Sequence, residues 1–370
     1  LMAQAFLEMQ RVNPGFDADR LLTVGVRLSS AKYPDQEQRA AFQAEVLQAV
    51  GSVPRVEAVG AVQHLPLDFS TGLIGFEVEN WEPSSPDDEL FANLNLVSAG
   101  YFEAMGISVL RGRPFGAVDR PDSPPVIAIN QTMADRFWPG QDPIGRQVVL
   151  DEDEPEGGRV TIVAVVADVK HRWLTGDVWP QIYVPQSQHA SRGFTIVTRT
   201  AGDPVGFSTS VRQAIWSIDP GLPIGSARSM NQVVAQSLGP FQLASGIFTF
   251  FGILALLLAC MGIYGVVSYA VGRRLSEFGI RMALGAEAGQ VIGLVMRQGA
   301  LLAMIGMAIG LAMTATLGQL LSGATAIVPR PGLLVYAAVA LPLAASVLLA
   351  SYVPSRRAAA IDPASALRSS

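Results

Sequence analysis

The residue types that most often carry catalysis or bind metals are sparse and scattered in this chain. The three histidines, His64, His171 and His189, are far apart in the sequence, and no H-E-x-x-H pattern occurs. Each is better interpreted as a surface or loop residue than as a metal ligand. The acidic run Asp151–Glu156 lacks the alternating ligands and central glycine of a calcium loop, which favours a solvated hairpin tip. We therefore expect no catalytic residue, metal site or cofactor.

Nucleotide and disulfide chemistry are not indicated either. No G-x-x-x-x-G-K-[ST] motif occurs, so the chain does not bind ATP through a P-loop. Cys260 is the only cysteine, and it lies in a long apolar run where it is best interpreted as a small residue facing lipid or a helix. A catalytic role is the weakest hypothesis because no acid–base or nucleophile constellation stands out. We expect the protein not to be an enzyme.

One charged segment between two apolar runs has the pattern of a short docking helix. Ser276 can cap a helix whose first turn carries Glu277, opposite in sign to the N-terminal helix dipole. Phe278 lies on the apolar edge of this helix with Arg281 beside it, and Gly285 can end it. A helix lying in lipid headgroups and a docking helix for a cytosolic partner fit these residues about equally well.

Three runs without charged residues flank this segment and are long enough to cross a membrane. They lie within 243–271, 298–329 and 331–355, and a crossing helix needs about 20 apolar residues. Gly306 and Gly310 have the spacing of a small-xxx-small helix-packing face. The sequence therefore predicts three membrane spans in its last third.

Charge is distributed unevenly around these spans. The whole chain has a net charge of −5, but arginines outnumber acidic residues after residue 240, and the first 240 residues are acidic. The arginine-rich loop and the C-terminal tail are predicted to be cytoplasmic, which places the acidic domain outside. An acidic domain also makes nucleic acid an unfavourable partner.

Residues 1–12 could form a surface helix or the outer end of a membrane helix. We favour the second, because an exported domain without a signal peptide requires an upstream helix, and so we expect the chain to be a fragment.

The acidic domain is predicted to be an α+β sandwich with helices on one sheet face. Two strand–helix–strand units of similar size bracket it, each with an apolar stripe along its helix. The first has strands near 22–28 and 56–62, and the second near 194–199 and 222–227. Between the two units, strands are predicted at 93–97, 126–130, 160–169 and 182–184, with a short helix at 131–138.

The docking segment, RRLSEFGIRMALGAEAGQVIGLVMRQG, resembles the cytoplasmic segment of FtsX-like and MacB-like ABC transporter permeases. Further stretches agree and follow the order of that family: VNPGFDADRLLTV, LVSAGYFEAMGISVLRGRPF, VIAINQTMADRFWPGQDPIGRQV, IVAVVADVKH, IYVPQSQ and SYVPSRRAAAIDPASALR. The resemblance covers nearly the whole chain, and it is closest to large bacterial permeases in which such a unit can occur in duplicate.

The resemblance implies a membrane helix, a large periplasmic domain and then three further helices. The periplasmic domain would have a porter-like lobe built from 21–65 and 192–230, with a second lobe, 66–191, inserted. Such permeases dimerise, pair with a separate cytosolic ATPase and transmit force rather than pass substrate through a pore. By analogy, the ATPase would contact Glu277, Phe278, Gly279, Arg281, Leu284 and Gly285. Many members have an aliphatic residue at the position of Phe278, a change that the apolar edge should tolerate but that could alter partner choice.

The leading hypothesis is a permease subunit of an ABC-type efflux or mechanotransmission system in the bacterial inner membrane. Its expected partners are a cytosolic ABC ATPase, a second copy or a duplicated half, a periplasmic adaptor and membrane lipid. The alternatives are a regulatory protein that controls a periplasmic hydrolase and an orphan permease without an ATPase. The expected boundaries are 1–12 for the end of an upstream helix, 13–230 for the periplasmic domain, 231–242 for a stalk, 243–271, 298–321 and 333–353 for membrane spans, 272–297 for a cytoplasmic coupling loop, 322–332 for a periplasmic loop and 354–370 for a cytoplasmic tail.

Overall fold

The computed structural model of the chain has two compact units that divide between Gly239 and Pro240. We call residues 12–239 the head domain and the residues from Pro240 onward the helical unit. Each is described by itself. The described residues are 12–68, 72–79, 81, 90–151, 158–172, 174, 177–274, 277, 280, 288–324, 341, 343–346, 348–350, 352 and 356.

The first lobe of the head domain is an antiparallel sheet covered by two helices. Alternating apolar residues on β1 bury Leu22, Val24 and Val26 against α2 and α5. Burying each large aliphatic side chain contributes about 1.5–3 kcal/mol, so this one face stabilises the lobe substantially. The strand order is β11-β1-β10-β2. The elements are β1 (Leu21–Arg27), α2 (Gln36–Gly51), β2 (Val56–Val62), β10 (Gly193–Thr200), η1 (Pro204–Phe207), α5 (Ser208–Ile218) and β11 (Ile224–Ser229).

Both predicted strand–helix–strand units are present in this lobe, β1-α2-β2 and β10-α5-β11. Their strands interleave, because β1 pairs with β10 over seven positions from Leu21↔Arg199 to Arg27↔Gly193. The two sequence halves therefore share one sheet and one core, which agrees with the α+β domain predicted from the sequence.

The second lobe closes its strands into a ring. From β4 the order runs through β3, β7, β8 and β6 to β9, and β9 pairs in parallel with β4 again. Ile74, Ile127 and Ile182 point into the ring's core, where Met133 and Phe137 of α4 join them. The elements are β3 (Gly72–Val78), β4 (Phe91–Val97), β5 (Val109–Gly112), β6 (Val126–Asn130), α4 (Gln131–Phe137), β7 (Gln147–Leu150), β8 (Gly158–Val166) and β9 (Gln181–Pro185).

One strand of this lobe ends earlier than its composition predicts. The apolar run suggested a strand to Val169, but β8 ends at Val166. Asp168 turns out of the strand direction because its carboxylate accepts hydrogen bonds from the Asn130 side-chain amide at 2.7 Å and the Thr132 hydroxyl at 2.8 Å. A local polar network therefore overrides the hydrophobic pattern here.

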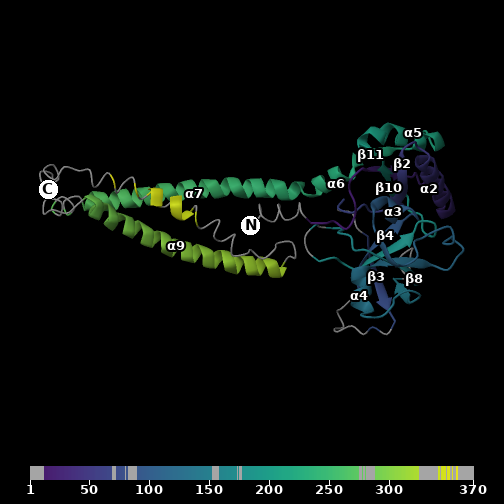
Figure 1. Cartoon of the computed structure of the whole chain (residues 1–370), viewed down its shortest axis with the longest axis horizontal. Coiled ribbons are helices and arrows are strands. Elements are labelled where there is room, and N and C mark those ends of the chain that lie inside the picture. The colour runs from purple at the N-terminus through teal and green to yellow at the C-terminus, as the bar shows by residue number, and fades with distance from the viewer. Residues whose placement is uncertain are drawn as a thin grey trace. The chain divides into compact units, whose positions relative to one another are not determined.

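The two lobes meet at α3 (Tyr101–Met105), which lies between β10 and β4 in Figure 1. Two glycines make the close approach possible. A Cβ at Gly60 would lie 2.5 Å from Tyr101 Cα, and one at Gly100 would lie 2.3 Å from the Val59 carbonyl oxygen. Val62 also pairs with Val97, which links β2 of the first lobe to β4 of the second. The lobes are thus joined by backbone contact rather than by a loop alone.

The helical unit contains α7 (Gly239–Arg273) and α9 (Ala288–Ala324). Within the described part of the chain, one helical stretch, Met230–Arg273, is long and apolar enough to cross a membrane by length and composition, and Met304–Thr314 of α9 is a shorter apolar stretch. The predicted span 333–353 falls largely outside the described residues. Cys260 Sγ of α7 lies 4.0 Å from the carbonyl oxygen of Ser346.

Candidate functional site

The sequence passes from the head domain into the apolar helix through a capped joint. Ser229, the last residue of β11, is also the N-cap of α6 (Met230–Ser237). Its hydroxyl accepts a hydrogen bond from the backbone N–H of Gln232 at 3.2 Å, and the Gln232 side-chain oxygen accepts one from the Ser229 N–H at 3.0 Å. This reciprocal capping box satisfies two backbone donors at the start of α6. The edge strand therefore becomes a helix without an intervening loop.

Helix α6 is seated in the head domain by its apolar side. Met230 and Val233 are buried, as is Leu238 at the C-cap. Helix α7 begins at the next residue, Gly239, so only Leu238 separates the two helices. Figure 1 shows α7 as one uninterrupted helix.

Arg228 of β11 fastens the joint further. Its guanidinium donates to the Gln236 side-chain oxygen of α6 at 2.8 Å and lies 3.6 Å from the Asp68 carboxylate. Its carbonyl oxygen accepts a hydrogen bond from the Thr23 hydroxyl of β1 at 2.9 Å. Arg228 thus connects β11 to β1, to α6 and to the loop that carries Asp68. We call Arg228, Ser229, Gln232 and Gln236 the joint cluster.

The predicted docking segment is described at few positions. Glu277 is helical and exposed, whereas Phe278, Gly279, Arg281, Leu284 and Gly285 lie outside the described residues. Gly306 and Gly310 lie inside α9, and a Cβ at either would meet nothing within 4 Å. This space is what a helix-packing face requires, and the packing role of these glycines stays a prediction.

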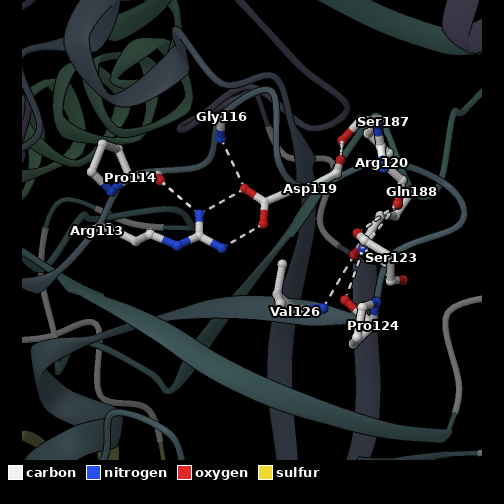
Figure 2. A network of polar contacts seen from close by, with 10 residues as sticks. All are labelled: Arg113, Pro114, Gly116, Asp119, Arg120, Ser123, Pro124, Val126, Ser187 and Gln188. Atoms are coloured by element: carbon white, nitrogen blue, oxygen red, sulfur yellow. Dashed lines mark hydrogen bonds and ion pairs between the residues drawn. The ribbon is translucent and has the colours of Figure 1, made fainter.

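A second polar network lies in the second lobe and is shown in Figure 2. The Arg113 guanidinium faces the Asp119 carboxylate with two parallel hydrogen bonds of 2.8 and 2.6 Å, and Gly116 N–H donates to the same carboxylate at 2.8 Å. These bonds, the Arg113 bonds above all, hold the pKa of Asp119 below its usual value. Asp119 is buried and both its oxygens are used, so the pair acts as a clamp on its loop rather than as an acid or base.

The same loop is held from its other end by Gln188. In Figure 2 the Gln188 side chain reaches across to the 123–126 segment. Its nitrogen donates to the Ser123 hydroxyl at 3.0 Å and to the Pro124 carbonyl at 3.1 Å, and its oxygen accepts from Val126 N–H at 3.1 Å. With all its polar atoms engaged, Gln188 fixes the entry into β6. This network has a structural role.

His171 lies in a loop, which is one of the two places expected from the sequence, but it is buried rather than at the surface. Its Nε2 lies 3.5 Å from the Tyr183 hydroxyl, which donates to the Gln181 side-chain oxygen at 2.6 Å. Burial, and less strongly the nearby His64, lowers the pKa of His171 to about 4, so its ring is neutral at pH 7. Lone histidines carry no sequence signal for burial, so only the fold reveals this cluster. Within the described parts of both units, no group of three His, Cys, Asp or Glu residues could hold a metal ion.

Family models match both units of the chain. The model of the MacB-like periplasmic core domain matches residues 5–214, more than half of the chain, and the model of the FtsX-like permease C-terminal region matches residues 249–363. The chain belongs to the MacB-like and FtsX-like permease family. Family membership was predicted from the motifs, and these matches confirm it. Permeases of this family are inner-membrane transporter proteins with a periplasmic domain.

Curated relatives within this permease family are distant. The chain is 24% identical over 292 residues to the macrolide export ATP-binding/permease protein MacB of Salmonella typhimurium, an alignment that covers 75% of this chain and 44% of the relative. It is 25% identical over 289 residues to the probable syringafactin export ATP-binding/permease protein SyfD of Pseudomonas syringae pv. tomato, covering 75% and 42%. The chain therefore spans less than half the length of these relatives.

Among the solved structures that the chain resembles is the periplasmic region of MacB from Actinobacillus actinomycetemcomitans. It is 14% identical, and the comparison covers 62% of this chain and 97% of that one with a TM-score of 0.41. The extracellular domain of the noncanonic ABC-type transporter YknZ from Gram-positive bacteria is 15% identical, with coverages of 54% and 91% and a TM-score of 0.33.

Proposed function

We propose that this permease is the membrane subunit of an ABC-type efflux or mechanotransmission system. A separate cytosolic ABC ATPase would bind the 272–297 loop, and its ATP-driven motion would pass through α7 and α6 to the head domain. The observation that carries this proposal is the joint cluster, where the capping box of Ser229 and Gln232 makes β11 continuous with α6.

Transmission of motion through α6 requires that this helix be rigidly attached to the head domain. A helix that starts without a cap frays in its first turn, whereas a capping box holds that turn and Arg228 braces it from the side. The only non-helical residue between α6 and α7 is the C-cap Leu238, which is itself buried. A push or rotation of α7 would therefore move an edge strand of the sheet rather than be absorbed by a loop.

The proposed arrangement in the membrane follows the charge pattern. Three spans follow the head domain, with the 272–297 loop and the C-terminus in the cytoplasm and the head domain in the periplasm. Two copies, or two halves of a duplicated protein, would pack through their spans, to which Gly306 and Gly310 are suited. A periplasmic adaptor would contact the head domain of an exporter, and lipid would cover the remaining apolar surface of α7.

The ATPase-binding role of the loop can be tested by charge reversal. In the full-length permease co-expressed with its ATPase, Arg281→Glu and Leu284→Asp should each abolish co-purification of the two proteins while membrane insertion stays normal. Arg356→Glu is the matched control, because it changes an exposed arginine outside this loop. Co-purification that survives both loop changes would refute the docking assignment.

A further inference from the structure

The head domain is connected to the rest of the chain by two segments, and the structure fastens them to each other. One is the incoming segment, residues 14–19, which precedes β1, and the other is α6, which follows β11. We propose that Arg199, Asp19 and Asn231 form a latch that holds the incoming segment, the sheet and α6 as one moving body. Its role in transmission rests on the proposed function, but its existence can be tested without it.

Arg199 of β10 is the hub of the latch. Its Nη1 donates to the Asp17 carboxylate at 2.8 Å and to the Asp19 carbonyl at 3.1 Å, and its Nη2 donates to the Asp17 carbonyl at 3.0 Å. Its Nε donates to the Ala104 carbonyl of α3 at 3.0 Å. The Arg199 side chain is only 11% exposed, whereas the Asp17 side chain is 53% exposed, so water reaches the carboxylate but not most of the guanidinium. One planar fork thus joins the sheet, α3 and the incoming segment.

The incoming segment is seated by its backbone as well. Lys170 N–H donates to the Pro14 carbonyl at 2.9 Å, and Asp17 N–H donates to the Met105 carbonyl at 2.9 Å. Phe16 between them is buried. The segment therefore follows a fixed path along both lobes before it enters β1.

Asn231 closes the connection to α6. Its side-chain amide donates to Asp19 Oδ1 at 3.1 Å, across 212 positions of sequence. Arg199 in turn donates to the Asp19 carbonyl, so α6 is linked to β10 through Asp19. The strand register supports this, because Leu21 of β1 pairs with Arg199 on one side and Thr23 pairs with Arg228 on the other. The two attachment points flank the same end of β1, and neither can shift alone without breaking these bonds.

Hydrogen–deuterium exchange on the full-length permease tests the latch without any partner. Asp19→Ala should raise amide exchange in residues 230–238 roughly fivefold, the effect of losing one hydrogen bond that holds the helix. Asn231→Ala should raise exchange in residues 14–20 to a similar degree and serves if the first variant folds poorly. Asp122→Ala is the control, since it breaks an exposed 3.3 Å pair with Arg120 that lies outside both measured segments. Unchanged exchange of each segment when the other is altered would overturn the latch.

A covalent lock tests whether the two segments move together. In a Cys260→Ser background, which removes the only native cysteine, Asp19→Cys and Asn231→Cys would be joined by a short bifunctional thiol reagent. With the ATPase bound, the locked protein should keep the nucleotide turnover of the unlocked one. Turnover lost on locking would contradict a single moving body while leaving the proposed function intact. An ATPase that never co-purifies would refute the proposed function, and the exchange result would still decide the latch.

Discussion

Ser229 and Gln232 cap each other's backbone at the point where the last strand of the head domain becomes a helix. The Ser229 hydroxyl accepts from Gln232 N–H at 3.2 Å, and the Gln232 side chain accepts from Ser229 N–H at 3.0 Å. Because Ser229 is both the end of β11 and the N-cap of α6, these two bonds hold the first turn of α6 directly against the end of the strand. The coupling proposed for this permease depends on that turn being held.

Loss of the capping box should weaken the joint measurably. Ser229→Ala is expected to lower the free energy of unfolding of the head domain by about 1 kcal/mol, the usual effect of removing an N-cap. Urea unfolding followed by tryptophan fluorescence measures this in the full chain, since every tryptophan precedes residue 240. Ser217→Ala is the control, because the Ser217 hydroxyl only bonds the Ala214 carbonyl of its own helix. Equal effects of the two changes would argue against the capping role.

The Arg113–Asp119 clamp should respond asymmetrically to the loss of either partner. The Asp119 side chain is 2% exposed and that of Arg113 is 45% exposed. Arg113→Met leaves a buried carboxylate unpaired and should cost roughly 3 kcal/mol, whereas Asp119→Asn leaves a cation that water reaches and should cost less. Urea unfolding of the two single variants and the double variant measures the difference. A larger loss for Asp119→Asn would contradict this interpretation.

The Arg113–Asp119 pair also makes the stability of the folded protein decrease at low pH. The pKa of Asp119 is lower in the folded protein than its ordinary value of 3.8, chiefly because Arg113 donates to the carboxylate. The stabilisation is therefore complete above pH 3.8 and is lost as the pH falls through the folded pKa. Arg113→Met should remove most of this contribution, as urea unfolding from pH 6 to 3 would show.

His171 makes folding stability depend on pH in a higher range, between about pH 4 and pH 6.5. Its folded pKa of about 4 lies below the ordinary value of 6.5, so between these values the unfolded chain binds a proton that the folded protein does not. Stability should fall as the pH is lowered from 6.5 toward 4, with a slope approaching about 1.4 kcal/mol per pH unit. Unfolding measured from pH 7.5 to 4.5 checks this, and His171→Gln should flatten the curve. His189→Gln should leave the part due to His171 in place.

The contact between the lobes requires glycine at residue 60. Gly60→Ala would place a methyl group 2.5 Å from Tyr101 Cα, which α3 can relieve only by moving off the sheet. We expect the free energy of unfolding to fall by about 1–3 kcal/mol, typical of overpacking. Gly25→Ala in β1 should be nearly neutral or slightly stabilising, because a Cβ there meets nothing within 4 Å. Thermal unfolding of the two variants makes the comparison.

The first lobe was predictable from sequence because its strands alternate and its helices carry apolar stripes. Leu22, Val24 and Val26 are buried on one face as their spacing indicates. In the second lobe, β3, β5 and β7 were not predicted. The β3 segment contains two glycines, while β5 and β7 are four residues each, too short for a periodic signal. Ring closure through β4 and β9 depends on pairing across some 90 residues, which no local pattern encodes.

The candidate site, like the fold, has one part that the sequence predicts and another that only the structure shows. A stalk near residues 231–242 was anticipated from the long charge-free stretch, but the capping box and Arg228 were not singled out. The S-x-x-Q pattern at Ser229 and Gln232 was a usable signal, because a capping box is recognisable in sequence. The latch was not predictable, since Asp19, Arg199 and Asn231 converge only after both sequence halves share one sheet.

The central claim is that α6 carries motion between a cytosolic ATPase and the head domain. Its most direct test is amide exchange of residues 230–238 in the full-length permease bound to its ATPase, measured with a non-hydrolysable ATP analogue and without nucleotide. The account predicts a nucleotide-dependent change in exchange along α6 and β11 that disappears in Arg281→Glu. Identical exchange in both states, while the bound ATPase still hydrolyses ATP, would contradict it.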